Sequence, residues 1–335
     1  MSTRPEVLPA ATRRPQTQIP ARIPGSIRRS SHIGVQTCDE RPDIVVHGAV
    51  RDVLNDAAGE GRIVGEASLD CVVALDRSVT SITSDPAEGA LSQLVGRVAH
   101  KGWRAAAREV VDADSLLSSL LDDVPIALLL SSYGALRQGS LDLPSVQPLM
   151  QRMRNLCAGW ASEATPMRII DAGEPMPLPG VVPVPHRDES DPLATEQRLP
   201  LVPGEVRRIR RLDVVPGDEV RIHASFRDTW CDADAVEGVL HEYVLTATLD
   251  ADGRVASVEA EPRVLPYNEC SLAAASPGRL IGQRIEEVAA QVKATADTTT
   301  CTHLDDLLRS LDVVPTLLRS SASGSGRGAT AGDGR

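Results

Sequence analysis

The second half of the chain has the most regular pattern of apolar and polar positions. Between Val220 and Phe226 apolar and polar residues alternate, and this period of two predicts a half-buried strand. Residues 243–249 alternate in the same way. The Asp-Ala-Asp-Gly segment at 250–253 predicts a hairpin turn, because Asp and Gly tolerate the dihedral angles that tight turns require. Residues 256–260 then predict a third antiparallel strand.

After these strands the apolar spacing changes. Ile285, Val288 and Val292 recur at the interval of an amphipathic helix, and leucines within 304–311 predict a second one. A run of strands followed by a run of helices is typical of an α+β fold. We therefore predict an antiparallel sheet with helices packed on one face.

The first half of the chain repeats this arrangement. Similar blocks follow one another in the same order: Pro24–Arg29 and Pro203–Arg208, His47–Asp56 and His223–Asp232, Leu75–Pro86 and Asp252–Pro262, Leu94–Arg97 and Leu280–Gln283, Ser115–Pro125 and Asp306–Pro315. Chance similarity rarely preserves order over so many blocks. We interpret the chain as a tandem duplication, with a degenerate first copy at 21–137 and a second copy at 203–319. The two copies are expected to pair within the chain as a pseudo-dimer.

The segments outside the two copies have a different composition. Residues 138–202 are expected to contain a helix over 146–161, followed by an extended Pro-rich linker. The ends, residues 1–20 and 320–335, are rich in Pro and Arg or in Gly, Ser and Ala, and are expected to be disordered tails.

Composition narrows the classes of function. The net charge of −11 and an aromatic content of 2% argue against a nucleic-acid-binding protein, which needs a basic surface and stacking platforms. No apolar run approaches the roughly 18 residues of a membrane span, and the N-terminus lacks the apolar segment of a signal peptide. Six scattered cysteines are typical of reduced thiols, so we expect a cytoplasmic protein.

Four residues that are able to do chemistry occur only in the second copy. They are Cys270, Cys301, His303 and His241, and His241 falls near Ala67 of the first copy. Cys301 is expected just before a helix N-terminus, where backbone N–H groups and the helix dipole favour a thiolate. With His303 as a base it would be a catalytic nucleophile. Alternatively, the four side chains are the ligands of a transition metal, either zinc or iron.

A purely structural interpretation remains open for these residues. Cysteines are often small buried hydrophobes, and histidines are often hydrogen-bonded core or cap residues. The other cysteines lack matching histidines and are expected to be ordinary core or surface residues: Cys38, Cys71, Cys157 and Cys231. The Arg51-Asp52 and Arg227-Asp228 pairs occur in both copies, which indicates a structural salt bridge or turn.

The second copy resembles a bacterial family known as a conserved domain of unknown function. The resemblance rests on a Cys in a Pro/Tyr loop at 265–270, on Leu280-Ile-Gly282 and on Cys301-Thr-His-Leu304, with Thr300 in place of the usual Gly. It implies a His at 241 and an Asp near 228. Longer, actinobacterial-like members share a Cys-Ala-Gly-Trp element, as at 157–160. The order of the small residues and cysteines is also similar to that of iron–sulfur scaffold proteins, which is an analogy of fold alone.

The resemblance implies no activity, so whether the chain is an enzyme stays open. The leading hypothesis is a protein that binds a transition metal or uses a reactive thiolate in its second copy. The alternative is a non-catalytic interaction or scaffold subunit, bound through the Pro-rich linker.

Overall fold

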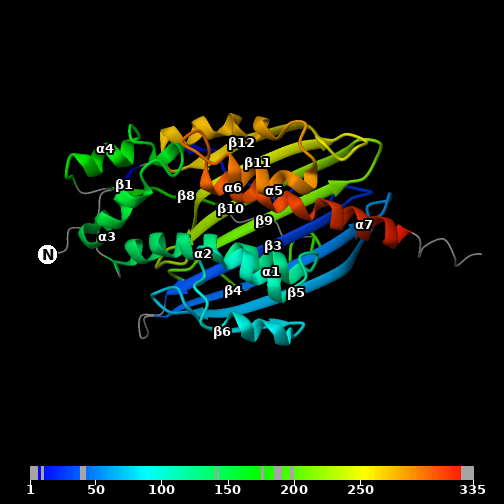
Figure 1. Cartoon of the computed structure of the whole chain (residues 1–335), viewed down its shortest axis with the longest axis horizontal. Coiled ribbons are helices and arrows are strands. Elements are labelled where there is room, and N and C mark those ends of the chain that lie inside the picture. The colour runs from blue at the N-terminus through cyan, green and yellow to red at the C-terminus, as the bar shows by residue number, and fades with distance from the viewer. Residues whose placement is uncertain are drawn as a thin grey trace, which may run out of the picture.

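Two four-stranded antiparallel meanders join edge to edge in one sheet (Figure 1). The computed structural model describes residues 7–8, 11–37, 43–139, 141, 143–174, 177–184, 191–196 and 200–325. The first meander consists of β3 (Ile27–Thr37), β4 (Ile44–Asn55), β5 (Gly61–Val73) and β6 (Val79–Asp85). The second consists of β9 (Val206–Val215), β10 (Val220–Cys231), β11 (Glu237–Leu249) and β12 (Val255–Leu265).

The meanders meet through antiparallel pairing of β3 with β9. Ile27 lies opposite Val214, and Val35 lies opposite Val206. In our sequence alignment Ile27 corresponds to Val206 and Val35 to Val214, so each contact is matched by its counterpart. Such self-complementary pairing is the geometry of a twofold dimer interface, here within a single chain.

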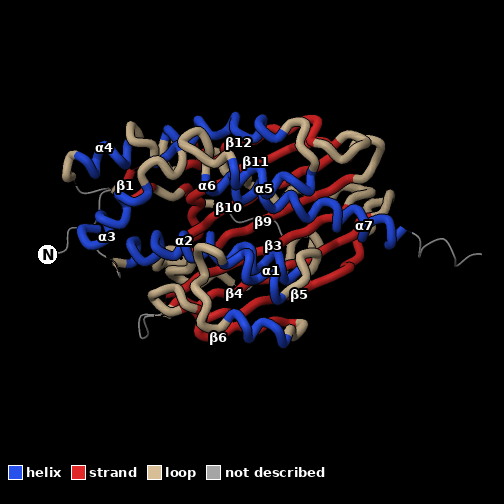
Figure 2. Tube along the Cα trace, in the orientation of Figure 1, coloured by secondary structure: helices blue, strands red, loops and turns tan. Residues whose placement is uncertain are grey.

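The helices cover one face of the sheet, which is turned toward the viewer in Figures 1 and 2. They include α1 (Trp103–Val110), α2 (Leu116–Gln138), α5 (Val288–Ala294), α6 (Thr302–Arg309) and α7 (Val314–Ser325), with the short 3₁₀ segments η1 (Gly89–Leu94), η4 (Asn268–Leu280), η5 (Ile285–Glu287) and η6 (Ser310–Val313). One apolar core lies under the helices of each half, and α7 contacts both β3 and β9 at the junction. The predicted α+β class, an antiparallel sheet with helices on one face, is confirmed.

Matching turns recur in the two meanders. Gly25 and Gly204 have φ values of 71° and 84°, and their N–H groups bind carbonyls at the end of the second strand of their own meander. Gly96 and Gly282 have φ values of 80° and 83°, and donate to Val79 and Val255 at 2.8 Å. Positive φ is costly for residues other than Gly. The two meanders therefore have glycine at corresponding turns.

The connection between the meanders is less regular than expected. It contains α3 (Leu143–Met150), η2 (Gln151–Met153), η3 (Ala158–Trp160) and α4 (Thr165–Asp171), then the short strands β7 (Leu178–Pro179) and β8 (Val182–Pro183). The helix predicted over 146–161 is therefore interrupted. Asn155 has φ of 62°, a left-handed conformation that ends helical geometry.

Parts of the expected disordered tails are ordered. The short strand β1 (Val7–Leu8) pairs with β7, and β2 (Thr12–Arg13) pairs with β12. The segment after β2 is held on the face away from the helices, where Arg28 donates to the carbonyls of Pro20 and Ala21. At the other end α7 continues to Ser325. Cys38, residues 1–6, 9–10 and 326–335 lie outside the described residues.

The long helix α2 is apolar enough to be compared with a membrane span. By length and composition alone, α2 is long and apolar enough to cross a membrane. The sequence did not suggest this, because it contains no continuous apolar run of that length. However, 61% of its most apolar window is buried inside the protein. It packs against β3, β4 and β5, which is the setting of a core helix.

Candidate functional site

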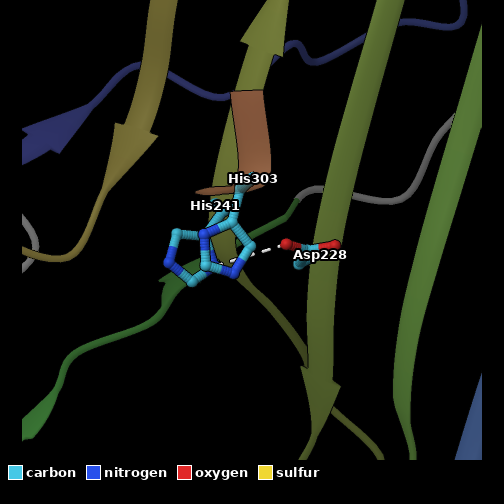
Figure 3. Close-up of side chains that lie close together, drawn as sticks. All are labelled: Asp228, His241 and His303. Atoms are coloured by element: carbon cyan, nitrogen blue, oxygen red, sulfur yellow. Dashed lines mark ion pairs between the residues drawn. The ribbon is translucent and has the colours of Figure 1, made fainter. Parts of the chain in front are cut away.

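Two imidazoles and one carboxylate meet where α6 crosses the second meander (Figure 3). Asp228 on β10 lies directly opposite His241 on β11, next to a β-bulge between Asp228 and Thr229. His303 enters from the first turn of α6, whose leucines anchor the helix on the sheet. One ligand atom from each side chain lies within 4.8 Å of the other two.

The two histidine rings are stacked. Their centroids are 4.0 Å apart with an interplanar angle of 20°, and His303 also stacks over Phe226 at 6.4 Å. Burial, together with the neighbouring His241, holds the pKa of His303 well below its ordinary value. His303 is therefore a neutral imidazole at physiological pH, which is the form that binds metals.

Asp228 is fixed by a buried arginine. Arg208 donates to both its carboxylate oxygens at 2.7 and 2.8 Å, and both side chains are fully buried. Burial alone would raise the pKa of Asp228, but the charge and hydrogen bonds of Arg208 hold it well below the ordinary value. The carboxylate is therefore ionised. His241 Nδ1 lies 3.4 Å from Asp228 Oδ2 but is buried without a hydrogen-bond partner among the described residues.

Arg208 connects this site to a second carboxylate. Its Nη1 donates to Asp306 at 2.7 Å, and Asp306 lies one turn after His303 on the same face of α6. Arg210 and Arg104 also bind Asp306. Burial alone would raise the pKa of Asp306, but these guanidinium groups hold it well below the ordinary value. The network fixes α6, and with it His303, against the sheet.

The first meander has the same ion pair without the histidines. Arg29 donates to both oxygens of Asp52 at 2.8 Å, and its Nη1 donates to Ser119, much as Arg208 Nη1 donates to Asp306. Asp52 lies opposite Gly65, also next to a bulge. Gly65 therefore occupies the place of His241. Gly65 lies two residues before Ala67, near which the sequence comparison had placed His241.

An apolar side chain fills the corresponding space in the first meander. A Cβ atom on Gly65 would lie 2.8 Å from Leu116 Cδ1, at the start of α2. Leu116 precedes Ser119 by three residues, as His303 precedes Asp306. The two halves thus share the arginine and aspartate, while Gly and Leu stand where the second half has histidines.

The adjacent Arg-Asp pairs do not bind one another. Neighbouring residues of a strand point to opposite faces of the sheet, so Arg227 and Asp228 cannot pair. Arg227 instead binds Glu242, and Asp228 binds Arg208. In the first meander Arg51 binds Glu66 in the same manner. A structural role for the pairs was expected, but with other partners.

Asp228 is the candidate ligand that the sequence reasoning did not include. It shares its strand face with Ile222 and Phe226, so the alternation places an acidic residue on an apolar face. A carboxylate in that position requires a buried partner. This was the signal that could have identified it.

The predicted cysteines are not part of the group of ligand atoms that Asp228, His241 and His303 form among the described residues. Cys301 is the N-cap residue of α6, and Cys270 lies in η4; both are buried. Burial raises the pKa of Cys301 to about 12, although it accepts hydrogen bonds from the N–H groups of Leu304 and His303. The pKa of Cys270 is also well above its ordinary value, chiefly because of burial. This direction does not favour a thiolate nucleophile.

A third cysteine approaches this region from the connecting segment. Cys157 precedes η3, and its thiol accepts hydrogen bonds from Gly159 and from Thr302 at the start of α6. Ala158 N–H donates to the carbonyl of Thr300 at 2.8 Å. Cys157 was expected to be an ordinary residue, because its local sequence contains no histidine.

The geometry therefore defines an α+β protein in which one buried aspartate and two partly exposed histidines form a group able to hold a metal ion. Residues 206–316, about a third of the chain, match the model of a family described as a protein of unknown function (DUF2889). This region begins with β9 and includes Asp228, His241 and His303. None of the curated proteins and none of the solved structures compared with the chain matches it.

Proposed function

We propose that the second half of the chain binds a transition metal ion, zinc or ferrous iron, through Asp228, His241 and His303. The supporting observation is the convergence of three ligand atoms, from three separate elements, within 4.8 Å of one another. Two imidazoles and a carboxylate are a common ligand set of catalytic zinc and non-haem iron centres. When bound, such an ion acts as a Lewis acid or activates a water molecule.

The side chains fit a cation chemically. His303 is neutral, and the buried Nδ1 of His241 lacks a hydrogen-bond partner among the described residues. Arg208 uses one lone pair on each oxygen of Asp228, and a carboxylate has about two on each oxygen. Asp228 therefore retains acceptor capacity, while Arg208 fixes its orientation from behind, as outer partners of metal ligands do.

We further infer that the first meander is a degenerate copy that serves as the structural partner of the second. The self-complementary β3–β9 register and the paired glycine turns support this inference. The first meander keeps Arg29 and Asp52 but has Gly65 and Leu116 in place of the imidazoles. A metal site is accordingly proposed in the second half alone.

Metal analysis of matched variants tests the proposal. The informative variant is His241→Gly with His303→Leu, because the first meander packs with these residues beside the same Arg–Asp pair. His223→Ala is the control, since His223 lies on the opposite face of β10. Protein purified in oxygen-free, reducing buffer is expected to carry about one equivalent of zinc or iron, retained in the control and lost in the double variant.

Cobalt substitution identifies the ligand type. Nitrogen and oxygen ligands give d–d bands without sulfur-to-metal charge transfer, whereas Cys270 or Cys301 as ligands would add an intense near-ultraviolet band. A charge-transfer band abolished by Cys301→Ser would return the site to the Cys/His ligand set predicted from the sequence. If neither zinc, iron nor cobalt binds the folded protein, the metal proposal is wrong.

A further inference from the structure

A pocket lies on the face of the sheet opposite the helices, across the junction of the two meanders. Polar residues of its lining come from β3, β9, β10 and β11 and from the segments that cover them, and they include Ser30, Arg211, Ser225, Arg227, Glu242 and Thr195. The cavity has a volume of about 30 Å³ and is partly open to solvent. Residues 16–20 and 194–195 form its cover.

Strand register explains why these side chains meet. Ser30 lies opposite Arg211, and Arg211 lies opposite Ser225, in one row across three strands. Arg227 and Glu242 form the next row on the same face. This face is separate from that of His241 and His303, so the pocket is independent of the proposed metal site.

Several lining residues have a buried donor with no hydrogen-bond partner among the described residues. They include the hydroxyl of Ser30, a residue with 2% exposure, Nη1 of Arg227, a residue with 3% exposure, and Nε of Arg211. The rest of the Arg227 guanidinium binds Glu242 and the carbonyl of Gln16. Unsatisfied buried donors are costly, so they indicate an acceptor that completes them.

The charges lining the pocket point to an anion. Arg211 lies 3.1 Å from Asp213 without hydrogen-bond geometry, and Arg28 binds both oxygens of that carboxylate. Burial lowers the pKa of Arg211 to about 10, which leaves it charged at neutral pH. Glu242 is the opposing charge in the lining, and Arg227 neutralises it. Two nearby basic residues are paired elsewhere, since Arg51 binds Glu66 and His32 lies beside Glu196.

We propose that this pocket binds a small oxyanion, which accepts hydrogen bonds from Arg211, Arg227 and Ser30. Guanidinium and hydroxyl donors around a partly enclosed space are the usual partners of phosphate, sulfate and carboxylate groups. The ligand bridges the two meanders at their shared edge, because Ser30 belongs to the first and Arg211 and Arg227 to the second.

Calorimetric titration of the full chain with inorganic phosphate, sulfate and acetate, at constant ionic strength set with chloride, tests this site. The matched variants are Arg211→Gln and Arg221→Gln, the latter an exposed arginine on β10. We expect saturable binding of an oxyanion, weakened at least tenfold by Arg211→Gln and unchanged by Arg221→Gln. Preference for phosphate or sulfate over acetate indicates a tetrahedral ligand, and the reverse indicates a carboxylate.

Ser30→Ala provides a second test if Arg211→Gln does not fold. Removing a hydroxyl that has no hydrogen-bond partner among the described residues is expected to leave the ligand-free melting temperature unchanged or higher, while reducing the increase produced by the oxyanion. If none of the three anions binds saturably, or if Arg211→Gln and Arg221→Gln behave alike, the pocket holds water only and the proposal is overturned.

Discussion

The close contact between Gly159 and Cys270 yields a sharp prediction about how the connecting segment packs on the second meander. A Cβ atom on Gly159 would lie 2.7 Å from Cys270 Sγ. This distance is about 1 Å shorter than the optimum for a nonpolar contact, roughly 3.5–4.0 Å. Both residues are held in place, since the N–H of Ala158 binds Thr300 and Tyr243 donates to the carbonyl of Cys270 at 3.2 Å.

Gly159→Ala is therefore expected to lower the free energy of unfolding by about 1–3 kcal/mol, the usual cost of overpacking. Cys270→Ala removes the sulfur and should cost roughly 1–2 kcal/mol through the small cavity it leaves. In the double variant the new methyl group occupies the space of the lost sulfur. It should be more stable than the sum of the single changes predicts, by about 1–2 kcal/mol.

Urea denaturation of the four proteins, followed by circular dichroism, measures this coupling. Gly278→Ala is the control, because a Cβ atom there meets nothing within 4 Å and its φ is not positive. It should change stability by less than about 0.5 kcal/mol. Strict additivity of Gly159→Ala and Cys270→Ala would refute the packing described for Cys157, Gly159 and Cys270.

Three further predictions concern buried charges and thiols. Asp306→Asn should lower the free energy of unfolding, measured by urea denaturation, by about 3–5 kcal/mol, because it leaves Arg208 and Arg210 buried without their shared carboxylate. A decrease of less than about 1 kcal/mol would contradict this ion-pair network. Burial, reinforced by Asp122, raises the pKa of Asp312 to about 6, so wild-type stability should fall as pH rises from about 4 to 6. Asp312→Asn should therefore be stabilising at pH 7.5 relative to wild type and neutral near pH 4, and the same difference at both pH values would contradict the burial effect. The thiol pKa values of Cys270 and Cys301 are raised, so both thiols should resist alkylation at pH 7 until the protein is unfolded. Peptide mass spectrometry measures this, and rapid labelling of Cys301 in the native protein would restore the nucleophile hypothesis.

Local periodicity was sufficient to predict the elements of the second half. The 243–249 alternation, the turn at 250–253 and the helix that includes Leu304 all lie where the pattern placed them. These features depend on residues close in sequence. Pairing of β3 with β9 joins residues about 180 positions apart, and an alternating strand does not specify which edge it meets.

The candidate site was predicted in part for similar reasons. Comparison of the two halves identified His241 and His303, because a residue present in one copy alone stands out. That comparison could not identify Asp228, since its counterpart Asp52 occurs in the first half. Cys157 depends on a contact between the connecting segment and α6, which the Cys-Ala-Gly-Trp element at 157–160 did not specify.

The two halves also distinguish a structural role of the histidines from a functional one. Both halves bury an arginine bound by an aspartate, so that pair is explained by the fold. The space beside this pair is filled by apolar atoms in the first half and by two imidazoles in the second. One imidazole has a buried Nδ1 without a hydrogen-bond partner among the described residues.

Replacing a poorly satisfied buried polar group with an apolar one is often neutral or stabilising. Without metal, the free energy of unfolding of the His241→Gly/His303→Leu variant should therefore lie within about 1 kcal/mol of that of the wild type. The small decrease arises from placing Gly in a strand. Zinc should stabilise only the wild type. A loss of several kcal/mol without metal would instead show that the stacked rings hold α6 on the sheet, which a purely structural role requires.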